Sequence, residues 1–337
     1  MALKKARAAV GPTPEVENAA GDVLGRGNAV DAVVAGVFAA AALSPGVLLG
    51  PVQLLVGGAG AGFLAVDGRV RQPGVGAPRP RGFVTADEIP DAARIGVSWL
   101  TSAMSVTMAT MGSQTWHAVL APSVSLAKGS ARQAVLARIQ QKGPRAFEDG
   151  ALGGELVAQF GRPNGGLLTP EDFQAAQPEV QKATRLTRGE LGIFTLPWAH
   201  LEAQRPAAPA REVDVARARV VAAVDRNATF ALACWDEATD GRYVEELGLR
   251  APFFAEPVRR GETRIKPGDI RPAAAPIAMI GSAAPEIAFA AFGASDAFDM
   301  LGQAIESYLA DRTIDAHGEA RLVALAHANA TASILRS

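Results

Sequence analysis

The most apolar run of the sequence extends from Ala32 to Leu49 and is long enough to raise the question of a membrane span. Asp31 opens the run, Pro45–Gly46 interrupts it, and its many alanines insert weakly into bilayers. Asn28 stands in the position of a helix cap, and Asp31 follows three residues later as the acid of a capping box. We therefore predict a helix from Ala29 to about Leu43, buried because it is apolar nearly all round.

The composition is that of a globular protein with a sizeable core. Of 337 residues, 49% are hydrophobic and 20% are charged, and the 33 basic and 34 acidic side chains leave a net charge of -1. No basic stripe is visible, so we expect no nucleic-acid partner. One cysteine excludes a disulfide framework, and four scattered histidines give no ligand spacing, so we expect neither a metal nor another cofactor.

The N-terminus is positively charged but has no apolar stretch of signal-peptide length before Pro12. We therefore expect a cytoplasmic protein that does not associate with a membrane.

Residues 52–70 contain two apolar segments around a glycine cluster, Gly57–Gly62. We predict two strands, followed by a hairpin turn at Asp67–Gly68. The glycines lack the GxGxxG spacing of a phosphate cradle, and a strand rather than a helix follows them. We expect them to allow close packing of the backbone instead.

The rest of the chain alternates helical and extended patterns. Residues 95–160 are mainly helical, and Thr169 caps a helix that begins at Pro170, with Asp172 in the capping-box position. The clearest further elements are amphipathic helices at 116–128 and 130–141, strands at 218–224, 229–234 and 287–292, and helices at 298–309 and 317–334.

Several segments, in the same order along nearly the whole chain, resemble the gamma-glutamyltransferase family. They are Gly27–Ala32, the glycine cluster with Asp67–Val70 and Ala77–Pro78, Leu168–Phe173, Pro197, Val224–Ala228 and Pro267–Pro272. The resemblance implies an α/β fold, the four-layer αββα sandwich of N-terminal-nucleophile hydrolases. It describes residues 1–337 as one domain, with a large-subunit-like part (1–203), a linker-like segment (204–217) and a small-subunit-like part (218–337). The chain is markedly shorter than a full family member.

Family members cut themselves to expose a threonine, whose hydroxyl attacks a gamma-glutamyl amide while its own amine acts as base. Matching the family's aspartate to Asp225 places the nucleophile at Ala218, and the threonine and histidine that follow it at Arg219 and Val220. A methyl group cannot attack a carbonyl. Between Thr195 and Thr229 the sequence has no Ser, Thr or Cys, so self-cleavage there exposes no nucleophile.

Other parts of the family's site also differ. The arginine that binds the substrate carboxylate falls on Gly74; Arg71 and Arg79 lie close by, although solvated surface arginines are the plainer interpretation of both. The serine pair after Pro197 becomes Ala199–His200, and the late glycine pair becomes Asp296–Ala297. A carboxylate at Asp296 opposes the negative charge of an oxyanion.

Three hypotheses remain. The first is a pseudoenzyme that binds a protein or a small gamma-glutamyl-like or carboxylate ligand, with Arg71, Arg79 and Asp296 as binding candidates. The second is an amide hydrolase or acyltransferase with relocated chemistry, for which Ser295–Asp296 with His200 is the set to test. Weaker candidates are Cys234, Thr229, Ser102 and His117. The third is a non-catalytic protomer of a homo-oligomer or mixed complex, with an exposed apolar patch where the helical part is short.

Overall fold

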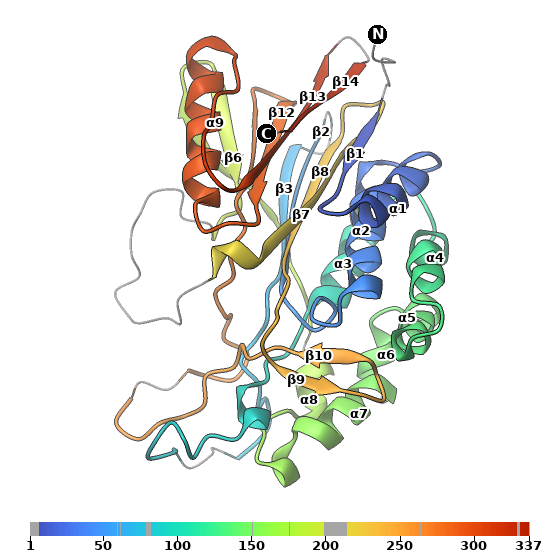
Figure 1. Ribbon diagram of the computed structural model, residues 1–337, viewed down its shortest axis with the longest axis vertical. Helices are drawn as coiled ribbons and strands as arrows, with labels where there is room; N and C mark the ends of the chain where they lie inside the picture. The colour runs from blue at the N-terminus through green and yellow to red at the C-terminus, as the bar shows by residue number, and fades with distance from the viewer. Residues whose placement is uncertain are drawn as a thin grey trace.

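The computed structural model describes residues 7–58, 60, 62–78, 82–149, 151–174, 176–198, 214–262, 265–328 and 331–336, the last segment by its backbone alone. Two six-stranded sheets, in which all neighbouring strands are antiparallel, form its centre (Figure 1). Sheet 1 has the order β1 (Ala8–Val10), β7 (Ala218–Val224), β8 (Phe230–Asp236), β2 (Val52–Gly58), β3 (Gly62–Gly68), β4 (Val180–Lys182). Sheet 2 has the order β14 (Thr331–Arg336), β13 (Arg321–Ala328), β12 (Pro285–Phe292), β11 (Ile277–Gly281), β6 (Leu191–Thr195), β5 (Thr184–Arg188). A small pair, β9 (Arg242–Val244) and β10 (Leu249–Ala251), completes the strands of the described residues.

Helices cover the outer face of each sheet. On the side of sheet 1 lie α1 (Pro14–Leu24), α2 (Ala29–Leu43), α3 (Leu100–Met111), α4 (Trp116–Leu126), α5 (Ala131–Lys142), α6 (Arg145–Glu148), α7 (Ala151–Phe160) and α8 (Pro170–Gln174). On the side of sheet 2 lies α9 (Ala297–Asp311). Three short 3-10 turns are η1 (Asp91–Arg94), η2 (Arg162–Asn164) and η3 (Val215–Arg217).

Three apolar cores separate these layers. The first lies between the helices and sheet 1 and includes Leu54 and Trp235. The second lies between the two sheets and includes Leu232 and Met279, and the third, between sheet 2 and α9, includes Leu301. This order of layers is the predicted αββα sandwich, and the fold class is confirmed.

The buried helix predicted from the apolar run is α2, which begins and ends at the predicted residues. Asn28 Oδ1 accepts the amide of Asp31 (3.0 Å), and Asp31 Oδ2 accepts that of Asn28 (2.8 Å), which completes the capping box. Fourteen of its fifteen residues are buried. A Cβ at Gly36 would lie 2.7 Å from Val221, so this glycine lets the helix approach β7 closely. Within the described residues, no helix is long and apolar enough to cross a membrane.

The glycine cluster forms the turn between β2 and β3, so the predicted turn at Asp67–Gly68 is wrong. Both residues end β3, paired with Gln53 and Val52. Gly60 and Gly62 have φ angles of +94° and +68°, which favour glycine, and therefore the chain reverses there. A Cβ at Gly57 would lie 2.7 Å from the ring of Pro285, which confirms close packing as the use of that glycine.

The helix predicted at residues 317–334 is also wrong, because this segment forms the β13–β14 hairpin. Residues 322–325 are all buried, since β13 lies between β12 and β14 with apolar cores on both faces. A run of alanine and leucine buried on both faces has no alternating pattern, and alanine and leucine favour helix locally. Pairing within the sheet overrides that local preference.

The remaining predicted elements are confirmed within a few residues: α4, α5, β7, β8, β12, α9 and the capped start of α8. Of the predicted linker, residues 204–213 lie outside the described residues, and Asp214 and η3 lead directly into β7.

Candidate functional site

The position predicted for a nucleophile lies at the start of a strand in sheet 1. Ala218 is the first residue of β7, pairs with Asp236 of β8 and is 2% exposed. Its methyl group belongs to the core between the two sheets, as do Val220 and Ala222. A hydroxyl at this position would therefore face sheet 2, but alanine has no atom that can attack a carbonyl.

Arg217, the residue before this position, is held by carboxylates. Its Nε lies 3.0 Å from Asp236 Oδ1, and its Nη1 lies 2.7 Å from Asp240 Oδ1. Burial acts to lower the pKa of Arg217, but these two carboxylates outweigh it and raise the pKa. Burial also raises the pKa of Asp236, against the opposing effect of Arg217. The peptide bond that self-cleavage would break is thus followed by a methyl group and preceded by an arginine fixed in ion pairs.

Arg219, where the family has its second threonine, is bound to the chain around it. Its Nη1 donates to the carbonyls of Ala216 (2.8 Å) and Ala218 (2.9 Å), and its Nε lies 3.0 Å from Glu237. A cavity of about 300 Å³ lies beside it, and Gly293 of the β12–α9 loop is also part of its lining. Ala218 is not part of its lining.

Asp296 has a structural role in the described residues. Its carboxylate accepts the amides of Glu319 (2.6 Å) and Ala320 (3.0 Å), which fastens the start of α9 to the segment before β13. Ser295 is exposed and has no hydrogen-bonded base among the described residues. Three residues of the predicted sites, Arg79, Ala199 and His200, lie outside the described residues.

The weaker nucleophile and base candidates occupy ordinary positions. Cys234 is fully buried in β8, and Thr229 lies in the turn before β8, against Gly58. Ser102 is half-buried on α3, and His117 is exposed on α4.

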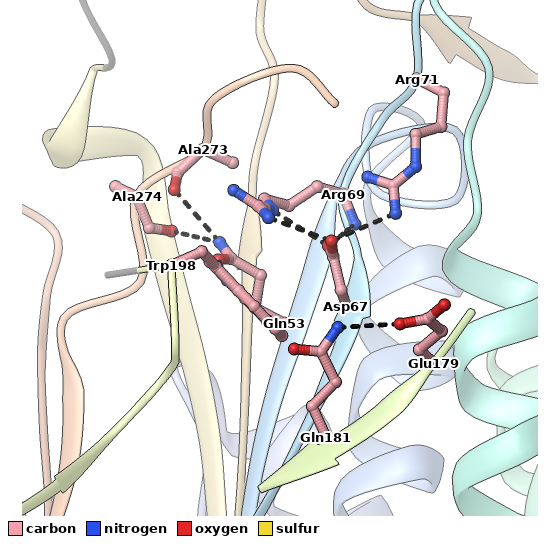
Figure 2. Close-up of polar contacts among 9 residues, drawn as sticks. All are labelled: Gln53, Asp67, Arg69, Arg71, Glu179, Gln181, Trp198, Ala273 and Ala274. Carbon is pink, nitrogen blue, oxygen red and sulfur yellow. Dashed lines mark hydrogen bonds and ion pairs between the residues drawn. The ribbon is translucent and has the colours of Figure 1, made fainter. Parts of the chain in front are cut away.

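A buried group of charged side chains, which we call the Asp67 cluster, lies at the end of β3 (Figure 2). Asp67 Oδ1 accepts Nε of Arg69 at 2.9 Å, and its Oδ2 accepts Nη2 of Arg71 at 3.1 Å. Arg69 lies over the ring of Trp198 at 4.8 Å, and Arg71 lies over that of Trp99 at 4.1 Å. The interpretation of Arg71 as a solvated surface residue is wrong, because it is 6% exposed and ion-paired.

Burial and charge act in opposite directions on the pKa values of Asp67 and Arg71. Burial acts to raise the pKa of Asp67, but the hydrogen bond and charge of Arg69 and the charge of Arg71 outweigh it and lower the pKa. Burial lowers the pKa of Arg71, with Asp67 opposing it. Arginine stays charged in proteins, so the cluster holds two cations against one carboxylate. Nη1 of Arg71 is buried and has no hydrogen-bond partner among the described residues.

Gln53 lies directly opposite Asp67 in sheet 1, and its side chain bonds to segments outside that sheet. Its amide nitrogen donates to the carbonyls of Ala273 and Ala274, both at 3.2 Å, and its oxygen accepts the indole of Trp198 at 2.5 Å (Figure 2). The side chain of Gln53, between Asp67 and Cys234 in sheet 1, is therefore fully engaged by other protein groups.

The sequence contained a signal for this cluster that our prediction missed. Asp67, Arg69 and Arg71 are two residues apart, and residues with that spacing face the same side of an extended chain. The turn predicted at Asp67–Gly68 concealed this relation.

No protein-family model matches the sequence, and no curated protein matches it. Solved structures match its fold. Gamma-glutamyltranspeptidase from Pseudomonas nitroreducens, complexed with L-DON, aligns over 58% of this chain and 72% of its own with 21% identity and a TM-score of 0.50. Cephalosporin acylase from Bacillus halodurans aligns over 98% of this chain and 96% of its own with 12% identity and a TM-score of 0.69. The chain has the fold of these two enzymes.

A protein named LmbA2991HD aligns over all of this chain and 97% of its own, with 14% identity and a TM-score of 0.74. The resemblance predicted from the sequence is thus confirmed at the level of the fold. Identities this low concern the fold alone, so the chemistry has to be argued from this chain's own residues.

Proposed function

We propose that this protein is a non-catalytic relative of the gamma-glutamyltransferases that keeps their fold for binding, scaffolding or regulation. The observation that carries the proposal is Ala218, a buried methyl group at the first position of β7. Covalent catalysis at this position needs a hydroxyl or thiol next to a base, and the residues beside it are Arg217 and Arg219, both engaged in ion pairs.

Two further features support the proposal. Asp296 stands where the family's oxyanion glycines are expected, and its carboxylate is already used to fasten α9. Gln53, which lies between Asp67 and Cys234 in sheet 1, is bonded to Trp198 and to the backbone of Ala273 and Ala274 rather than left open. In well-studied hydrolases, loss of the nucleophile alone lowers turnover by about a millionfold.

The test is the mass and activity of the purified chain. We expect one polypeptide of 34.8 kDa that releases no nitroaniline from a gamma-glutamyl anilide. Ala218→Ser adds a hydroxyl at the position, and Ala222→Ser adds the same group on the same face of the same strand as a control. We expect both variants to stay intact and inactive. Cleavage between residues 217 and 218, in the wild type or in Ala218→Ser alone, would show that the surrounding machinery is competent.

Arg71 Nη1 supports a carboxylate ligand as the bound molecule, because a buried guanidinium nitrogen without a partner is unusual and prefers an anion. L-Glutamate is the probe, with its thermal stabilisation of the protein as the measurement. We expect the stabilisation to be lost in Arg71→Lys, which keeps the charge but not the planar fork. No stabilisation of the wild type would leave Arg71 with a structural role and favour a protein partner, which light scattering and copurification would reveal.

A further inference from the structure

A second charged cavity lies apart from the start of β7, between two segments at the lower left of Figure 1. One segment contains η1, and the other is the extended chain that follows β10. The cavity has a volume of about 430 Å³. Arg94, Arg259 and Arg271 line it together with Glu256, and the side chains of Ile89 and Phe253 form apolar walls.

Two of the three arginines have unused hydrogen-bonding capacity. The side chain of Arg271 is 7% exposed; its Nε donates to the carbonyl of Phe254 (3.0 Å) and its Nη2 to Glu256 (2.7 Å), while its Nη1 has no partner among the described residues. Arg94 makes a single hydrogen bond, from Nη2 to the carbonyl of Ala86 (3.3 Å), and has no carboxylate partner in the part of the chain described. By contrast, Nε and Nη2 of Arg259 are both paired with the carboxylate of Glu262.

The walls of this cavity are fixed before any ligand arrives. The amide of Ala255 donates to the carbonyl of Arg94 at 2.8 Å. The side chain of Gln72 makes a two-way pair with the backbone of Glu256, with both hydrogen bonds at 2.9 Å. The backbones of Phe83 and Arg259 also pair. A preformed site loses little conformational entropy on binding.

We infer that this cavity binds a small carboxylic acid with an apolar body, its carboxylate between Arg94 and Arg271. A planar guanidinium matches a carboxylate with two parallel hydrogen bonds, and burial strengthens the attraction. Arg259 and Arg271 are paired with Glu262 and Glu256, so the positive charge of Arg94 is left without a carboxylate among the described residues and attracts an anion into the cavity. The apolar walls and Glu256 disfavour a strongly hydrated dianion such as phosphate.

This inference does not rest on the proposed function, because none of the lining residues belongs to the sites predicted from the sequence. Phenylacetate is the probe, titrated into the whole protein by calorimetry at low salt. Phenylacetamide, which has the same shape without charge, and inorganic phosphate, which has charge without the apolar body, are the comparison compounds. We expect phenylacetate to bind at least about tenfold more tightly than either.

Arg94→Gln is the decisive variant: Arg94 is half-buried and has no ion pair with any described residue, so the fold is expected to survive its loss. We expect it to weaken phenylacetate binding by about tenfold or more, whereas Arg138→Gln, on another surface, leaves binding unchanged. Arg271→Lys, with folding checked by circular dichroism, is expected to weaken binding as well. Arg71→Lys leaves this site intact, which separates it from the L-glutamate test. Absence of binding by the wild type, equal binding of phenylacetamide, tighter binding of phosphate or an unaffected Arg94→Gln variant would each overturn the inference.

Discussion

The reactivity of the Cys234 thiol is determined by its surroundings in the fold. Cys234 is fully buried between the sheets, and burial raises its pKa far above the usual range, with the charge of Asp236 acting in the same direction. The thiolate is the reactive form of cysteine, so a buried thiol with a raised pKa is inert. We expect no reaction with a thiol-specific chromogenic disulfide at pH 8 in the folded protein, and one equivalent in urea. Rapid labelling of the folded protein would contradict this burial and return Cys234 to the candidate nucleophiles.

Asp67 links the stability of the protein to pH. Burial acts to raise its pKa, but Arg69 and Arg71 outweigh burial and lower it. Its ion pairs therefore stabilise the folded state fully above about pH 4, and less as the pH falls through the folded pKa. We expect Asp67→Asn to lower the free energy of unfolding by about 3 kcal/mol at neutral pH, because it leaves two buried arginines without their carboxylate. Urea denaturation at several pH values measures this difference.

The difference between wild type and Asp67→Asn should shrink as the pH falls below about 4, because the carboxyl of the unfolded chain then takes up a proton. It should be smallest below the lowered pKa of the folded state, where the folded carboxyl is protonated as well. Asp22→Asn, an exposed change on α1, is the matched control and should have little effect at any pH. A constant difference across the acid range would mean that the ion pairs of Asp67 do not contribute to stability.

The helix α2 is held to its surroundings by the side chain of Asp31. Besides the amide of Asn28, the carboxylate of Asp31 accepts the amides of Ser113 (3.0 Å) and Gln114 (3.2 Å), so one carboxylate joins α2 to the loop between α3 and α4. We expect Asp31→Ala to cost about 3 kcal/mol, because three backbone donors lose the same buried acceptor together. Thr13→Ala, which removes the simple cap of α1, should cost about 1 kcal/mol. Equal costs in thermal or urea unfolding would contradict the cross-link role of Asp31.

The sequence predicts well those helices whose ends are marked by capping residues or by proline. Asn28, Asp31 and Pro45 determine both ends of α2, and Thr169 with Asp172 determines the start of α8. The β13–β14 hairpin was missed because its alanine and leucine residues carry no local sign of the sheet that surrounds them.

The candidate site was predictable only in part. Matching Asp225 to the family's aspartate assigned the nucleophile position to Ala218 and predicted a strand from that residue. The structure places Ala218 at the start of β7, as expected. The Asp67 cluster depends on Gln53, Trp198 and the backbone of Ala273, which come from distant parts of the sequence. Such contacts are created by the tertiary fold and leave no pattern within a short window.

At the scale of the whole molecule, both sheets mix strands from the two ends of the chain. β7 lies between β1 and β8, β8 pairs with β2, and β11 pairs with β6. Residues 1–203 and residues 218–337 therefore both contribute strands to each of the two sheets. Separating them would expose the paired edges of β7, β8 and β11 together with the apolar cores on their faces.

We therefore expect residues 214–337, expressed alone, to show no cooperative unfolding by circular dichroism, because β1 to β6, which are six of the twelve described strands of the two sheets, are absent. Coexpression with residues 1–213 should give a complex that copurifies and unfolds in one transition, close to that of the intact chain. The uncut protein is the control for the midpoint, and a mixture of separately refolded fragments controls for assembly during synthesis. Cooperative unfolding of residues 214–337 alone would contradict this expectation. It would show that these residues fold without the strands from residues 1–213.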